Sequence, residues 1–171
     1  VITGLPNVGK SSILNGLVEK ERAIVTHLPG TTRDTIEEVL DIEGIQVKIT
    51  DTAGIRPADD PAEQLGVERA REAVRCADLV LLVMDGSTPF TEEEDTLISW
   101  IGRAGKDLIC ILNKKDLPQK VEPGRIGSRL GSGSDLLHIS ALDRRDIEVL
   151  ITAITSHALK RGLPDGEELL L

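Results

Sequence analysis

A phosphate-binding loop constrains this chain more than any other stretch of its sequence. Residues 4–11 read Gly-Leu-Pro-Asn-Val-Gly-Lys-Ser, which has the G-x-x-x-x-G-K-[ST] spacing of a P-loop. Gly4 and Gly9 allow the tight turn that directs backbone N–H groups toward oxyanions. Lys10 brings a positive charge to the β- and γ-phosphates, and the Ser11 hydroxyl can bind Mg²⁺. The motif predicts a site for a nucleoside triphosphate.

The hydrophobic pattern alternates between strands and helices along the chain. Predicted strands cover residues 1–3, 35–42, 45–50, 78–84, 107–112 and 135–139. Predicted helices cover residues 10–20, 63–76, 91–103 and 146–160, with a short helix inside 117–134. This alternation predicts a three-layer α/β fold with a mostly parallel sheet and one antiparallel hairpin. The loops that follow strands should meet at one edge of the sheet: 4–11, 51–54, 113–116 and 140–142.

The loop at residues 113–116, Asn-Lys-Lys-Asp, predicts which base the site accepts. The carboxylate of Asp116 can accept hydrogen bonds from two adjacent donors of guanine, N1–H and the 2-amino group. Adenine offers no such pair. Asn113 would tie this loop to the P-loop, and the stem of Lys114 can cover one face of the purine. A P-loop ATPase or kinase would have no use for these residues.

A second phosphate motif, Asp51-Thr52-Ala53-Gly54, closes a predicted strand. A carboxylate at Asp51 can approach Mg²⁺ through water, and the Gly54 N–H can donate to the γ-phosphate. A simple strand-ending turn would look the same in isolation. At this distance after a P-loop, the motif favours the phosphate site.

The composition limits the remaining classes of function. The 171 residues include 20 Lys and Arg against 29 Asp and Glu, a net charge of −9, which argues against a broad basic surface for nucleic acid. No apolar run reaches the length of a membrane span. Cys76 and Cys110 lack metal-binding spacing and are expected to be buried free thiols in a reducing cytoplasm. Since the chain has no initiator Met, we expect residues 1–160 to be a domain excised from a longer protein, and residues 161–171 a linker to a missing domain.

These motifs resemble the translation-factor-like branch of the P-loop GTPases over residues 1–160. Several families of this branch share the residues at positions 6–7, 29–34 and 51–54. The stretch at 63–70 is most similar to the G domain of the MnmE (TrmE) family of tRNA-modification GTPases. The resemblance implies a Ras-like fold with a six-stranded, mostly parallel sheet and one antiparallel edge strand. The chain departs from the pattern at Leu142, where these GTPases commonly have Lys, and it lacks the usual glycine in residues 143–146.

The resemblance also implies the residues that hold GTP or GDP and Mg²⁺. The expected nucleotide contacts are Asn7, Val8, Gly9, Lys10, Ser11, Ser12, Asp51, Gly54, Asn113, Lys114, Asp116, Ser140, Ala141 and Leu142. The backbone N–H of Ala141 is expected to meet the guanine carbonyl oxygen. The expected Mg²⁺ ligands are Ser11, Thr32 and Asp51, with Thr32 closing onto the ion when the γ-phosphate is present.

Catalysis must differ from that of Ras-like enzymes, because Ile55 stands where those enzymes have a water-positioning Gln. In the similar family a Glu of the second switch has this role, and it aligns with Glu63, which would act with Lys10, Thr32 and Gly54. From the sequence alone, the water-positioning role could equally fall to Asp59, Asp60 or Glu68. Glu63 also fits a plain acidic residue at a helix N-terminus.

The resemblance implies that K⁺ replaces an arginine finger and that two G domains pair through their switch regions in the GTP state. The expected K⁺ ligands are the side chain of Asn7 and backbone carbonyls between Thr26 and Leu28. Implied partners are an MnmG-like flavoprotein and tRNA, the latter contacted mainly outside this domain. The alternative is a ribosome-assembly GTPase similar to the Der family, in which GTP gates partner docking.

Overall fold

The computed structural model describes residues 1–20, 37–42, 44–50, 71–131, 134–160 and 168–170. In this part of the chain the strands form two sheets. The first is parallel, with the order β1 (Ile2–Thr3), β4 (Leu79–Asp85), β5 (Asp107–Asn113) and β6 (Asp135–His138). The second contains the antiparallel pair β2 (Glu37–Ile42) and β3 (Ile45–Thr50), with β7 (Glu168–Leu170) parallel to β3.

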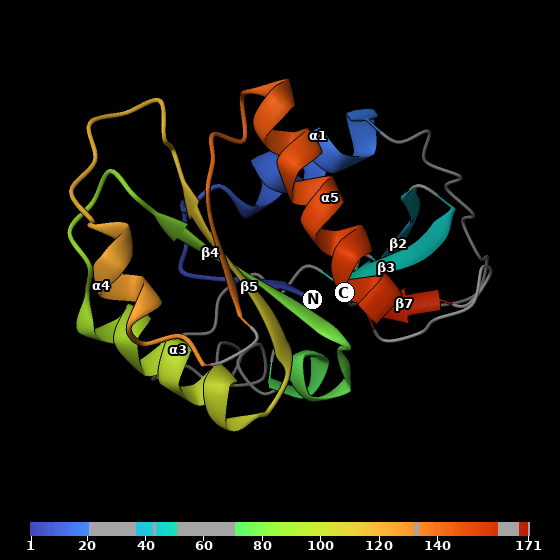
Figure 1. The fold of residues 1–171 in the computed structure, drawn as a ribbon, viewed down its shortest axis with the longest axis horizontal. Coiled ribbons are helices and arrows are strands. Elements are labelled where there is room, and N and C mark those ends of the chain that lie inside the picture. Colours follow the sequence, from blue (N-terminus) through green and yellow to red (C-terminus); the bar gives the residue numbers. More distant parts are fainter. Residues whose placement is uncertain (21–36, 43, 51–70, 132–133, 161–167, 171) are drawn as a thin grey trace.

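Helices cover both faces of the parallel sheet, which gives the expected three layers (Figure 1). One face packs against α1 (Lys10–Lys20) and α5 (Arg144–Lys160), which lie side by side. The other face packs against α3 (Glu92–Arg103), α4 (Pro123–Gly127) and the helical residues 71–76. In β4, Leu81 and Val83 belong to the first core, while Val80 and Leu82 belong to the second. This period of two explains why the strand is apolar throughout.

Local sequence signals place the helix boundaries. Thr91 accepts a hydrogen bond from the Glu94 backbone N–H at 3.2 Å, and the Glu94 carboxylate accepts from the Thr91 backbone N–H at 2.8 Å. These two contacts form a capping box, which satisfies two backbone donors at the start of α3.

None of the helices that the structure describes is both long enough and apolar enough to span a membrane.

The α/β class and the mostly parallel sheet are confirmed, with three differences in detail. The described strands are divided between two sheets instead of the six-stranded sheet expected from the resemblance. Residues 168–170, which we expected to lie in a linker, pair with β3 as β7. Cys76 is exposed rather than buried, because it lies on the outer side of the helical residues 71–76, while Cys110 is buried as predicted.

Candidate nucleotide-binding site

The P-loop joins β1 to α1, and its backbone adopts conformations that few residue types accept. Gly4 has φ +145° and Gly9 has φ +101°, and Asn7 also lies in the left-handed region with φ 63°. A Cβ atom on Gly4 would lie 2.2 Å from a backbone oxygen of β4. Lys10 Nζ donates to the carbonyl oxygens of Gly4 at 3.1 Å and Leu5 at 2.9 Å. The loop therefore packs on the carboxyl end of β4, with its lysine folded over it.

Asn113 ends β5 and joins the P-loop to two further loops. Its Nδ2 atom donates to the Val8 carbonyl oxygen at 2.9 Å, and its Oδ1 atom accepts from the Ala141 backbone N–H at 2.9 Å. The residue is 2% exposed, so both polar ends of the amide are satisfied inside the protein. The predicted tie to the P-loop is present. The Ala141 N–H, which we expected to meet guanine, donates here to Asn113.

Lys114 contacts both the P-loop and the carboxylate of Asp85, a residue that belongs to none of the sequence motifs described above. Its Nζ donates to the Asn7 carbonyl oxygen at 2.9 Å and to Asp85 Oδ2 at 2.5 Å. Burial of Asp85 acts to raise its pKa, but hydrogen bonds from Lys114 and Ser87, with the charge of Lys114, hold that pKa below its ordinary value. Asp85 is the last residue of β4, so the rule that drew attention to other strand ends could have found it.

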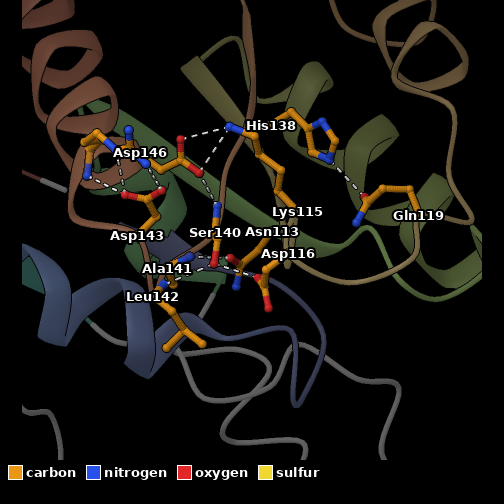
Figure 2. Close-up of polar contacts among 11 residues, drawn as sticks. Asn113, Lys115, Asp116, Gln119, His138, Ser140, Ala141, Leu142, Asp143 and Asp146 are labelled. Carbon is orange, nitrogen blue, oxygen red and sulfur yellow. Dashed lines mark hydrogen bonds and ion pairs between the residues drawn. The ribbon is translucent and has the colours of Figure 1, made fainter.

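Asp116 is held by the loop that follows β6 (Figure 2). Ser140 Oγ donates to Asp116 Oδ1 at 2.6 Å, and the Leu142 backbone N–H donates to Ser140 Oγ at 3.3 Å. Leu142 is 81% exposed. The two loops predicted to recognise the base therefore touch, and an apolar side chain stands at their rim.

These loops border a cavity of about 310 Å³. Its walls are Gly9, Ser12, Asn113, Lys114, Asp116, Leu117, Ser140, Ala141 and Leu142. The volume lies at the lower end of the range for small-molecule sites, about 300–1,000 Å³. The cavity combines an acid for hydrogen bonding with apolar side chains and the start of a helix, which suits a purine beside phosphates. Positions far apart in the sequence are thus brought together as expected.

The remaining predicted site residues lie outside the described part of the chain: Thr26, Leu28, Thr32, Asp51, Gly54 and Glu63. Ser11 lies in the first turn of α1 and is exposed, a position open to a metal ion. The chemistry of the P-loop fits a magnesium nucleotide, since the side chain of Lys10 can bind phosphate and the hydroxyl of Ser11 is a ligand that Mg²⁺ accepts. The described residues thus supply one of the three expected Mg²⁺ ligands.

The fold and the loops at its strand ends define a P-loop GTPase, an enzyme that hydrolyses GTP. The sequence model of the 50S ribosome-binding GTPase family matches residues 1–114, and the chain belongs to that family. Curated relatives include the tRNA modification GTPase MnmE of Geobacillus thermodenitrificans, 47% identical over 154 residues, which covers 90% of this chain and 33% of that protein. The MnmE of Clostridioides difficile is 43% identical over 171 residues, covering 100% of this chain and 37% of that protein.

Solved structures agree with the fold. The G domain of the T. maritima FeoB iron transporter has a TM-score of 0.68 at 25% identity and covers 92% of this chain and 96% of that domain. The cytosolic domain of the same transporter in a GDP form has a TM-score of 0.70 at 24% identity, covering 99% of this chain and 64% of that chain. The present chain spans about a third of the length of the curated relatives it matches.

Proposed function

We propose that this chain is a Mg²⁺- and K⁺-dependent GTPase domain that pairs with a second copy in its GTP state and drives conformational change in tRNA wobble-uridine modification in the cytoplasm. The observation that carries guanine-nucleotide binding is the junction at Asn113, where three loops meet. They are the P-loop, the base loop (residues 113–116) and the loop after β6. Identity of 43–47% to proteins named tRNA modification GTPase MnmE supports the tRNA step. The proposed partner, an MnmG-like flavoprotein, follows from the family resemblance.

The described residues divide the work of binding between the phosphates and the base. The P-loop amides and Lys10 would bind the phosphates, while Asp116 would accept the two guanine donors. Mg²⁺, held by Ser11 with Thr32 and Asp51, would supply positive charge between the β- and γ-phosphates. Asp85 and the Asn7 carbonyl oxygen hold the Lys114 ammonium, so that its stem is available at the side of the base.

Asn7 supports the K⁺ part of the proposal. Its backbone lies at φ 63° and its carbonyl oxygen is tied to Lys114, which fixes the exposed residue at the mouth of the P-loop. A monovalent cation held by Asn7 together with Thr26 and Leu28 would offset charge that develops between the β- and γ-phosphates. Ile55 cannot orient water, so Glu63 is proposed to do so.

GTP turnover in matched KCl and NaCl tests the cation and the pairing together. We expect K⁺ to raise turnover about 100- to 1,000-fold, because one electrostatic contact to charge that develops in the transition state has effects of this order. Mass measurement with GDP and aluminium fluoride should find a dimer in KCl and a monomer in NaCl. Asn7→Gly is the matched variant, since glycine keeps the left-handed backbone and removes the side chain. Equal turnover by a monomer in both salts would refute K⁺ activation and leave Asn7 a structural role.

Glu63→Ala is expected to lower GTP turnover about 100-fold or more at saturating K⁺, since general-base positioning contributes about 10²–10⁴. Affinity for GDP should stay within about twofold of the parent value, because the proposed role is confined to the attacking water. The control is Glu68→Ala, which removes an acid of the same segment. Parent turnover in the Glu63 variant, or a larger loss in the Glu68 variant, would show that another acid does this work.

The second candidate function is that of a ribosome-assembly GTPase similar to Der. It is favoured by the matching sequence family, which is described as a 50S ribosome-binding GTPase. In that case GTP would gate docking and hydrolysis would act as a timer. Sedimentation with 50S subunits separates the two functions. GTP-dependent binding to the subunits at micromolar concentration would favour the ribosome-assembly function, whereas no binding with either GTP or GDP would favour tRNA modification.

A further inference from the structure

Asp146, in the first turn of α5, is a buried acid that connects two loops of the nucleotide site. The residue is 9% exposed. Lys115 Nζ approaches its Oδ1 atom at 3.0 Å and its Oδ2 atom at 3.3 Å. The same Oδ2 atom accepts a hydrogen bond from the Ser140 backbone N–H at 2.8 Å. Both carboxylate oxygens therefore have partners (Figure 2). Oδ1 contacts Lys115 of the base loop, and Oδ2 contacts both Lys115 and Ser140, which lies in the loop after β6.

The two partners of Asp146 stand next to the group expected to read the base. Lys115 directly precedes Asp116 in the chain, and Ser140 holds Asp116 through the 2.6 Å hydrogen bond from its hydroxyl. The Lys115 backbone N–H also donates to the Ile139 carbonyl oxygen at 3.1 Å, so the two loops run side by side. Asp146 thus holds the backbone of Ser140, whose hydroxyl contacts Asp116, and the side chain of Lys115, the residue before Asp116.

The chemistry of this contact favours a fixed geometry. A carboxylate that is mostly out of water needs partners for its charge, and it has an ammonium and a backbone amide. Asp143, three residues earlier, makes a useful contrast. It is an acid near the same helix N-terminus, but its carboxylate contacts the backbone N–H and guanidinium of Arg145. The helix dipole favours both acids. Of the two carboxylates, that of Asp146 connects the base loop with the loop after β6.

We propose that Asp146 is a positioning residue for guanine recognition: by holding Lys115 and the Ser140 backbone, it sets the Asp116 carboxylate in the orientation that receives both guanine donors. This inference rests on the proposed role of Asp116. Within residues 143–146, where the chain lacks the usual glycine, the acid at position 146 supplies a contact that a glycine side chain cannot make. Figure 2 shows the connected side chains.

The test compares GDP with inosine diphosphate, which lacks the 2-amino group. Asp146→Asn keeps the volume of the side chain but removes its charge, and we expect GDP affinity to fall about tenfold because a charged hydrogen-bonded pair is lost. Affinity for inosine diphosphate should fall about twofold, since that ligand already lacks one bond to the carboxylate. The preference for GDP therefore narrows about fivefold. Asp143→Asn should leave both affinities and their ratio unchanged.

Lys115→Met removes the other member of the Lys115–Asp146 ion pair. Because the Lys115 side chain is 48% exposed, this variant should fold even if the Asp146 variant does not. We expect it to narrow the preference for GDP to a similar extent, and the double variant to be little worse than either single one. Equal losses for both nucleotides, or no loss, in both single variants would refute the positioning role. A parent protein that binds both nucleotides equally would instead refute guanine recognition by Asp116.

Discussion

Replacing Asp116 with Asn is expected to weaken GDP binding by about three orders of magnitude, because it disrupts two hydrogen bonds to a charged group, each of which contributes about 1.5–3 kcal/mol. The carboxylate accepts from both guanine donors. An amide presents one acceptor and one donor, which suits the N1–H and the 2-carbonyl oxygen of xanthine. The variant should therefore gain affinity for xanthosine diphosphate as it loses affinity for GDP.

Fluorescence titrations with the two nucleotides check this exchange. The Asn side chain can still accept the hydrogen bond that Ser140 Oγ gives to Asp116 at 2.6 Å, so the loops should keep their arrangement and the melting temperature should change little. A loss of GDP binding with no gain for xanthosine diphosphate would show that Asp116 supports the loop and does not read the base.

Gly9→Ala is expected to reduce GDP affinity at least about 100-fold, since strain and a lost buried hydrogen bond each cost on the order of 1–3 kcal/mol. A Cβ atom at this position would lie 2.2 Å from Asn113 Nδ2, and the backbone has φ +101°. The methyl group must displace Asn113 from the Val8 carbonyl oxygen, which separates the P-loop from the base loop.

Gly124→Ala in α4 is the matched control, since a Cβ atom there meets nothing within 4 Å. Isothermal titration with GDP measures both variants. If Gly9→Ala bound GDP as tightly as Gly124→Ala, the close packing of the P-loop against Asn113 would have no part in nucleotide binding.

Features with a local sequence signal were predictable. The capping box at Thr91 and Glu94 depends on residues three positions apart, and β4 and β5 are apolar runs bounded by polar residues. The base loop and the P-loop each have a spacing that their chemistry requires. Because parallel strands place their following loops at one edge of the sheet, the contact between Asn113 and the P-loop was also predictable, and it is made at the Val8 carbonyl oxygen.

Features that depend on distant pairing were not predictable. The three residues of β7 are too few for a pattern, and they become a strand because Val47 pairs with Leu169. Asp146 has no local signal of its role, since its partner Lys115 lies 31 positions away. The prediction for Cys76 was wrong because apolar neighbours in sequence do not show which side of a helix faces the core.

The two thiols of this protein differ enough in reactivity to be told apart by a chemical reagent. Burial raises the pKa of the Cys110 thiol to about 12, with the nearby charge of Glu94 adding to the effect, so its nucleophilic thiolate is scarce at neutral pH. Cys76 is exposed, and these are the 2 cysteines of the sequence. A maleimide fluorophore therefore attaches at one position without any engineering, which makes energy transfer between two labelled copies a direct way to watch them meet.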